Sequence, residues 1–283
     1  TMSQTMQTAT RRTPIAYDYP LSDPVTDEEL NILLIVNGCV LLGLLSAFGS
    51  ICNVINIVVF LRMGFKDTIN ISLFCIAVDD TGALITLIWG TICLNPLMIH
   101  KFEDLEMSEI NYVTSAWPHS YFVRVTGFTT CVVTIERYIC IAYPLKVRNI
   151  VTSRRTVIIN ISLFVILSAG IVPLFASTYA VVRASISKNR TVTGLITKEA
   201  LVIENYVRYS NNILRPITFI IVLFMTILLI YRLKRTAEWR NSTATNSKQG
   251  TISKRDHKVV VMVLFISIFF IVCYFPIFVN FFG

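Results

Sequence analysis

The chain has 283 residues and a formal net charge of +8, yet 54% of its residues are apolar and only 15% are charged. A soluble domain of this composition would lack the polar side chains needed to cover its surface. The composition therefore excludes a soluble globular protein and places the chain in lipid.

Six apolar stretches reach the roughly 20 residues that a membrane-crossing helix needs. In chain order they cover residues 31–61, 69–98, 111–142, 151–180, 212–230 and 259–282. Each is continuously apolar, whereas a strand of a membrane barrel alternates apolar and polar residues. The predicted fold class is all-α, an integral membrane helical bundle spanning 31–283.

Residues 1–30 contain no apolar core that could act as a secretory signal, and their Thr, Ser, Asp and Pro content predicts a mobile extracellular tail. Basic residues concentrate after the first, third and fifth stretches, for example Arg62, Lys146 and Arg235. The positive-inside rule makes those connections cytoplasmic and the N-terminus external, in a multi-pass protein of the cell membrane. Because the basic clusters lie between spans, they indicate contact with membrane lipids and exclude nucleic-acid binding.

The second stretch carries two adjacent acids, Asp79 and Asp80, at a depth where a carboxylate is costly. Neighbours on a helix point about 100° apart, so we expect the two acids to face different helices. Arg124 in the third stretch is one candidate partner for Asp79, and a neutral Asp79 facing lipid is the alternative.

The third stretch ends in Glu136-Arg137-Tyr138, and Ile141, Pro144 and Leu145 follow at fixed spacing. This E-R-Y-x-x-I-x-x-P-L pattern, directly after an apolar helix, resembles the inner end of the third span of rhodopsin-like (class A) G-protein-coupled receptors.

The resemblance implies a receptor that converts binding of an extracellular ligand into activation of a heterotrimeric G protein. It implies that Arg137 pairs with Glu136 and Asp256 in the resting state and leaves Asp256 when the sixth helix moves outward. It also implies that Tyr138, Ile141, Pro144 and Leu145 contact the G protein. The alternative for Asp256 is a solvent-exposed position among basic residues, where ion pairs contribute about 0–1 kcal/mol.

The first two spans also resemble the family. Asn53 matches the G-x-x-x-N region, and Asp80 takes the place of the buried aspartate. The resemblance implies a sodium ion at Asp80, with Thr126 supplying a hydroxyl. The alternative is a protonated, hydrogen-bonded Asp80, because adjacent acids raise each other's pKa.

In the sixth span, Phe270, Cys273, Tyr274 and Pro276 resemble F-x-x-C-W-x-P, with Tyr in place of Trp. Proline removes a backbone hydrogen bond and bends the helix, so Phe270, Tyr274 and Pro276 form a predicted hinge.

Depth in the spans predicts a ligand pocket lined by His119, Tyr121, Arg124, Asn212, Arg215 and Tyr274. The amine-anchoring aspartate of aminergic receptors would fall at His119, which disfavours an amine ligand. Arg124 and Arg215 favour an anionic group on a peptide or a chemosensory small molecule. The competing interpretation is that these arginines pair internally or snorkel.

All seven cysteines fall in predicted spans, and Tyr112 stands where the family has the cysteine of its outer disulfide. The usual disulfide is therefore not expected. Asn189 begins a sequon on the outer side and is a predicted glycosylation site.

Family members have seven spans, so the sequence is interpreted as a fragment lacking the seventh. Short runs such as 64–73 resemble the invertebrate chemosensory and peptide-receptor branch. No metal-spaced cluster, nucleophile motif or phosphate-binding loop is present, so we expect no enzyme and, apart from sodium, no cofactor. A transporter or channel and an opsin-type light receptor remain the alternatives.

Overall fold

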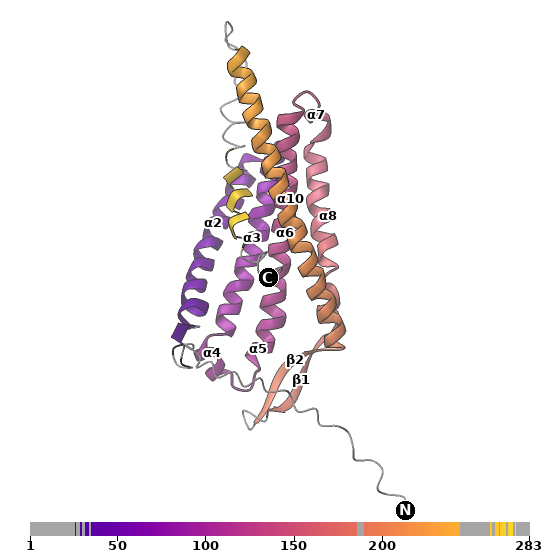
Figure 1. Ribbon diagram of the computed structural model, residues 1–283. Coiled ribbons are helices and arrows are strands. Elements are labelled where there is room, and N and C mark those ends of the chain that lie inside the picture. The colour runs from indigo at the N-terminus through magenta and orange to yellow at the C-terminus, as the bar shows by residue number, and fades with distance from the viewer. Residues whose placement is uncertain are drawn as a thin grey trace, which may run out of the picture.

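The computed structural model describes residues 26, 29, 32, 33, 35–185, 190–243, 261, 264, 265, 267–269, 271–273 and 275. Long helices lie side by side and form an elongated bundle (Figure 1). A two-stranded hairpin, β1 (Thr178–Ser185) and β2 (Arg190–Thr197), lies at one end, and the short helix α7 (Val147–Ile150) lies at the other. We call these the hairpin end and the α7 end.

Five helical segments in the described part of the chain are long and apolar enough to cross a membrane. They are Ile35–Met63, Thr68–Cys93, Met107–Ala142, Ser153–Ser177 and Val202–Leu233. Large apolar side chains cover their outer surfaces: Leu44, Leu45 and Phe48 of the first are all more than 60% exposed. Such a surface suits lipid, and the predicted all-α membrane bundle is confirmed.

The remaining bounds show where helices begin and end within these segments. The first segment is η1 (Ile35–Leu41, a π-helix) and α2 (Leu42–Met63), and the second is α3 (Thr68–Cys93). The short α4 (Pro96–Lys101) precedes the third, which is α5 (Met107–Asn111), η2 (Tyr112–Ala116) and α6 (Trp117–Ala142). The fourth is α8 (Ser153–Ser168) and α9 (Val172–Ser177), and the fifth lies within α10 (Ala200–Thr243).

Local chemistry explains the differences from the predicted spans. The second helix ends at Cys93 because Asn95 starts a new one: its side chain accepts the Leu97 N–H at 2.9 Å, with Pro96 in the first turn. The fourth segment breaks before Pro173 and continues as a strand from Thr178. The predicted sixth span lies mostly outside the described residues, and its described positions are helical.

A proline also accounts for the wide helical turn of η2. Pro118 follows at the start of α6 and has no N–H to donate to the preceding turn. The N–H of Trp117 instead bonds the carbonyl of Tyr112, five residues earlier. Such π-type turns are common next to functional sites.

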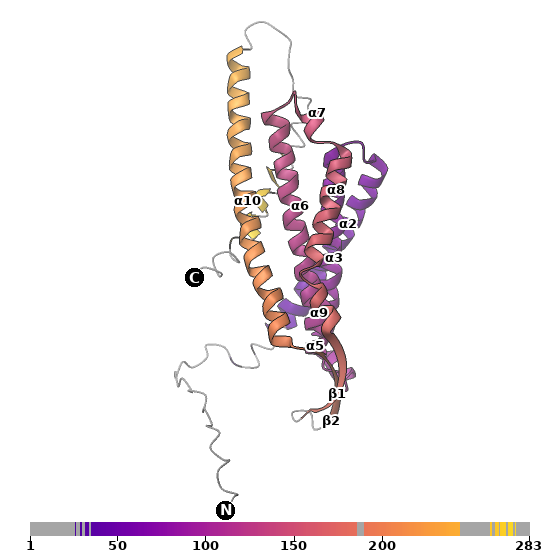
Figure 2. The same ribbon diagram turned by 90° about the vertical axis from the view of Figure 1, so that its right-hand side faces the viewer.

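Packing runs from α2 to α3, from α3 to α6, and from α6 to α10 (Figure 2). The main apolar cluster lies on α6, α8, α9 and α10 and comprises Trp117, Tyr121, Val125, Leu167, Ile171, Leu174 and Val207. Gly82 lets α3 approach α6 closely, since a Cβ there would lie 2.6 Å from the Phe122 ring. Small residues at helix contacts are typical of membrane bundles.

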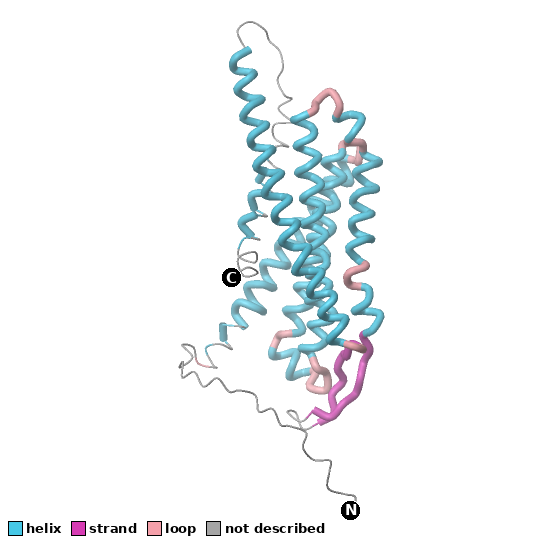
Figure 3. Tube along the Cα trace, turned by 45° about the vertical axis from the view of Figure 1, so that its right-hand side comes forward, coloured by secondary structure: helices cyan, strands magenta, loops and turns pink. Residues whose placement is uncertain are grey.

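The hairpin is an antiparallel pair whose register runs from Thr178 opposite Thr197 to Ser185 opposite Arg190 (Figure 3). It connects α9 to α10 and extends from the end of the bundle. No strand was predicted from the sequence, and this pair forms the one sheet found in the described residues.

Candidate functional site

Helix α6 carries Glu136 and Arg137 to the α7 end of the bundle. The Glu136 carboxylate is 6% exposed and accepts hydrogen bonds from Thr156 of α8 at 2.5 Å and Ser72 of α3 at 3.5 Å. This acid therefore joins three helices through neutral hydroxyl groups.

Arg137 points elsewhere. Its Nη2 donates to the hydroxyl of Thr68 at 3.3 Å, at the start of α3, and its buried Nε has no hydrogen-bond partner among the described residues. No ion pair joins Glu136 to Arg137 in the described structure, which corrects the expected pairing. Consecutive residues on a helix point about 100° apart, and here they turn toward different partners. Asp256, the other expected partner, lies outside the described residues.

The residues after Arg137 form an increasingly exposed surface. Tyr138 and Ile141 are half-buried, Pro144 is exposed, and Leu145 is 96% exposed in the turn that follows α6. Basic side chains of four loops and helix ends share this end of the bundle: Arg62, Lys66, Lys146, Arg148, Arg154, Arg155, Arg232 and Arg235.

In the middle of the bundle, both adjacent acids turn toward α6. Thr126 donates its hydroxyl to Asp80 at 2.9 Å, and Thr129 interacts with the carboxyl of Asp79, which is 4% exposed. The expectation that the acids face different helices is wrong. They lie on either side of the α3–α6 contact, and residues three apart on α6 serve both. Asn53 is half-buried on α2.

At the hairpin end, a cavity of about 420 Å³ lies between the start of the third segment and α10. Its lining residues recur at helical spacing on both walls, so each wall is one helix face. They are Tyr112, Ala116, Trp117, Ser120, Arg208, Asn211, Asn212 and Arg215.

Only some of the predicted pocket residues line the cavity. Asn212 and Arg215 line the cavity, and Arg124 lies behind it, 3% exposed, with its Nη1 donating to Asn211 Oδ1 at 2.6 Å. Arg124 therefore reaches toward α10 and is not the partner of Asp79. Arg215 donates to Ser120 at 2.6 Å.

His119 and Tyr121 do not line this cavity, which corrects their prediction. His119 Nδ1 lies 3.0 Å from the Ala83 carbonyl of α3, and the Tyr121 hydroxyl donates to the Phe164 carbonyl of α8 at 2.9 Å. Three consecutive residues of α6, 119 to 121, thus face three different helices. Sequence reasoning missed Ser120 and Arg208, although each lies one helical turn from a predicted residue: Ser120 precedes Arg124 by four positions, and Arg208 precedes Asn212 by four.

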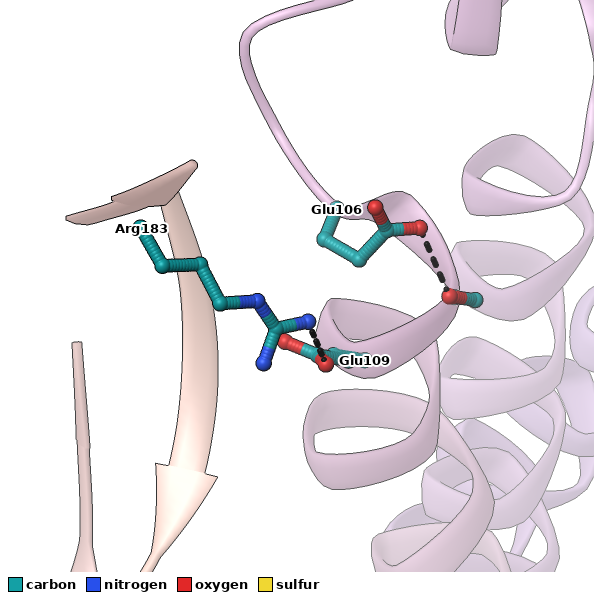
Figure 4. A network of polar contacts seen from close by, with 4 residues as sticks. Glu106, Glu109 and Arg183 are labelled. Carbon is teal, nitrogen blue, oxygen red and sulfur yellow. Dashed lines mark hydrogen bonds and ion pairs between the residues drawn. The ribbon is translucent and has the colours of Figure 1, made fainter. Parts of the chain in front are cut away.

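Charged side chains and backbone hydrogen bonds hold the hairpin against α5 and the segment before it (Figure 4). Arg183 of β1 points to Glu109 and pairs with it, while Glu106 accepts from the Ser108 hydroxyl at 3.0 Å. Arg190 of β2 pairs with Glu103. The Thr193 N–H donates to the Asp104 carbonyl at 2.7 Å, and the Glu106 N–H donates to the Thr193 carbonyl at 2.9 Å.

All seven cysteines are free, so no disulfide holds the hairpin in place. The ion pairs and backbone hydrogen bonds take that role. Gly194 lies directly beneath Glu109, and a Cβ there would lie 2.1 Å from Glu109 Oε2, so a larger residue would displace this carboxylate.

Several predicted residues cannot be placed. Phe270, Tyr274, Pro276 and the sequon at Asn189 lie outside the described residues. One described residue of the same segment, Ser267, is fully buried with its hydroxyl 3.2 Å from that of Thr134 on α6. Ser267 therefore packs on α6 within one turn of Glu136 and Arg137.

No group of three or more His, Cys, Asp or Glu side chains suited to a metal ion occurs in the described part of the chain. Residues 52–282 match the family model for the 7 transmembrane receptor (rhodopsin family). That match begins in α2 and covers most of the chain, including Asp80, the Glu136-Arg137-Tyr138 motif and the cavity. The chain therefore belongs to the rhodopsin family of seven-transmembrane receptors.

Proposed function

We propose that this receptor activates a heterotrimeric G protein at its α7 end when a ligand binds at its hairpin end. The observation that carries the proposal is the state of Arg137. It lies near the end of α6, the helix that leads into the turn with the exposed Leu145, and its one hydrogen bond to a side chain in the described structure is the 3.3 Å bond to Thr68. Such a bond costs little to exchange for contacts with a docking protein.

The charge distribution supports this orientation. Basic residues dominate the loops of the α7 end, whereas at the hairpin end Lys101, Arg183, Arg190 and Lys198 lie among six acids: Glu103, Asp104, Glu106, Glu109, Glu199 and Glu204. The positive-inside rule then makes the α7 end cytoplasmic and the hairpin end extracellular, in the cell membrane. The basic residues also suit contact with anionic lipid.

In the resting receptor, Glu136 stays bound to Thr156 and Ser72 and acts as a fixed point between α3, α6 and α8. Arg137 is the mobile member, with Asp256 of the sixth span as its proposed resting partner. An outward movement of that span about the Phe270, Tyr274 and Pro276 hinge would free Arg137 for the G protein. Tyr138, Ile141, Pro144 and Leu145 would form the rest of the docking surface.

The pair Asp80 and Thr126 suits a sodium ion, because their oxygen atoms lie 2.9 Å apart in a partly buried site. A bound cation would offset the cost of two adjacent acids within the bundle. Asn53 on the neighbouring α2 is the third proposed member of this polar region.

The ligand is proposed to be a peptide or a chemosensory small molecule, as in the invertebrate branch that the sequence resembles. Its proposed site is the 420 Å³ cavity, whose size suits a small molecule or the end of a peptide.

Two exposed leucines at opposite ends provide a matched test. Leu145 is 96% exposed at the α7 end, and Leu97 is 77% exposed at the hairpin end. In vesicles containing the full chain and a heterotrimeric G protein, Leu145→Asp should lower basal guanine-nucleotide exchange at least severalfold. Leu97→Asp should leave it unchanged. Equal exchange rates for Leu145→Asp and the unaltered receptor would remove the docking surface from the proposal.

A further inference from the structure

The cavity at the hairpin end is rich in positive charge. Arg208 and Arg215 line it, and Arg124 lies one layer behind through Asn211. None of these three arginines forms an ion pair with a carboxylate in the described part of the chain. Glu204 lies at the rim, where it accepts from the Tyr112 hydroxyl at 3.4 Å.

Two of the charges are close enough to repel each other. Arg124 and Arg215 interact electrostatically, and the hydrogen bonds found for them among the described residues go to neutral side chains across the helix contact, Asn211 and Ser120 respectively. Arg124 is 3% exposed, and its Nε has no hydrogen-bond partner. Buried cations are costly without a counter-charge, so an anion between α6 and α10 would be stabilising.

A second observation points to the same cavity. The indole Nε1 of Trp117 is buried without a hydrogen-bond partner, although Trp117 is a lining residue. Buried indole N–H groups usually find an acceptor. The ring also meets that of Tyr112 edge to face, with centroids 5.5 Å apart, which gives the cavity an aromatic wall.

We propose, resting on the receptor function above, that this cavity binds a carboxylate attached to an aromatic or other apolar group. The carboxylate lies between Arg208 and Arg215, whose planar guanidinium groups bind carboxylates through paired hydrogen bonds. The apolar group packs on Tyr112 and Trp117, and a turn of the buried indole would bring the Trp117 N–H to the ligand. Arg124 positions Asn211 and adds positive potential.

Ligand binding would also act on the bundle. The Ser120–Arg215 and Asn211–Arg124 bonds join α6 to α10. A carboxylate that binds Arg215 would replace the Ser120–Arg215 hydrogen bond, which is one of these two links. Its binding would therefore favour a different arrangement of α6 and α10.

The test uses two probes of the same shape that differ in charge, 3-phenylpropionate and 3-phenylpropionamide. Thermal unfolding of the purified full chain in lipid nanodiscs is measured over a range of probe concentrations. The carboxylate should raise the midpoint in a saturable way, and the amide should not. Arg215→Gln and Arg208→Gln should each weaken the apparent affinity about tenfold or more, as expected for loss of a hydrogen bond to a charged group. Arg148→Gln, an exposed change at the α7 end, should leave it unchanged.

Arg208 is exposed at the edge of the cavity, so Arg208→Gln keeps the test valid even if Arg215→Gln impairs folding. A short peptide ending in Phe, compared with its C-terminal amide, distinguishes the two sources of the carboxylate. Protection by the acid peptide alone indicates a peptide C-terminus, and protection by 3-phenylpropionate alone indicates a small molecule. Either result supports the proposal.

Equal protection by 3-phenylpropionate and its amide, no protection by any of the carboxylates, or unchanged affinity in both arginine variants would overturn it. No G protein is present in this assay. A failure here therefore leaves G-protein activation untouched, and a failure of nucleotide exchange leaves ligand recognition untouched.

Discussion

Thr156 of α8 donates its hydroxyl to the carboxylate of Glu136, 2.5 Å away, and so binds this acid to a neighbouring helix and not to the adjacent Arg137. Both groups are buried, with Thr156 1% and Glu136 6% exposed. The bond separates a fixed acid from a movable base within one short motif.

Replacing Thr156 with Val keeps the shape of the side chain but removes this donor. The buried carboxylate then loses its shortest hydrogen bond, and we expect the receptor to be destabilised by about 1–3 kcal/mol. Thermal unfolding in nanodiscs measures the effect. Ser162→Ala, on the exposed face of the same helix, is the matched control and should have little effect. An unchanged midpoint for Thr156→Val would show that Glu136 does not depend on α8.

The hairpin tether predicts a local change without global unfolding. Arg183→Ala removes the ion pair with Glu109, and exposed ion pairs contribute about 0–1 kcal/mol. Hydrogen exchange in β2 should therefore rise by up to about fivefold, while the helices keep their protection.

Charge reversal supplies the control for the tether. Arg183→Glu alone should raise exchange further, and the double variant Arg183→Glu with Glu109→Arg should restore part of the protection. Equal exchange in the single and double variants would mean that the backbone bonds of Thr193 hold the hairpin by themselves.

The Asp80–Thr126 pair predicts sodium-dependent stability. An ion that binds only the folded state stabilises that state. NaCl should therefore raise the unfolding midpoint above the value in choline chloride at equal ionic strength. The gain reaches about 2.7 kcal/mol at a hundred times the dissociation constant. Asp80→Asn and Thr126→Ala should remove the difference between the salts. Its persistence in Asp80→Asn would place the ion elsewhere.

The close contact between α3 and α6 at Gly82 predicts that replacing two different glycines with alanine will have unequal effects on stability. A Cβ at Gly82 would lie 2.6 Å from the Phe122 ring, so Gly82→Ala should destabilise the bundle by about 1–3 kcal/mol. Gly38 lies in η1 with nothing within 4 Å of its Cβ position, and Gly38→Ala should be neutral or slightly stabilising. Adding Phe122→Leu to Gly82→Ala should recover part of the loss in thermal unfolding.

Continuous apolar length was enough to predict the helical membrane bundle, because each helix satisfies its own backbone hydrogen bonds in lipid. It could not predict the hairpin. The strand Thr178–Ser185 follows directly on an apolar helix, and its pairing depends on partners in a second strand, from Arg190 opposite Ser185 to Thr197 opposite Thr178. Helix α10 also begins earlier than its apolar run, since polar residues such as Arg208 and Asn211 face the cavity and not lipid.

Spacing placed the Glu136-Arg137-Tyr138 motif at a helix end, but not its contacts. Those depend on how α6 is rotated about its axis, which brings Glu136 to Thr156 and Arg137 to Thr68. The same rotation directs His119 and Tyr121 away from the cavity and Ser120 into it. The sequence predicts how deep a residue lies along a span. The direction in which its side chain points depends on how the helix packs against its neighbours.

The central claim is that Arg137 acts in G-protein activation. The most direct test measures guanine-nucleotide exchange with the Arg137→Gln receptor. The full chain is reconstituted with a heterotrimeric G protein, and the control is Arg148→Gln, an exposed arginine at the same end of the bundle. We predict that Arg137→Gln lowers basal exchange at least tenfold while the unfolding midpoint stays close to that of the unaltered receptor, and that Arg148→Gln retains exchange. Full exchange by a folded Arg137→Gln receptor would contradict the account.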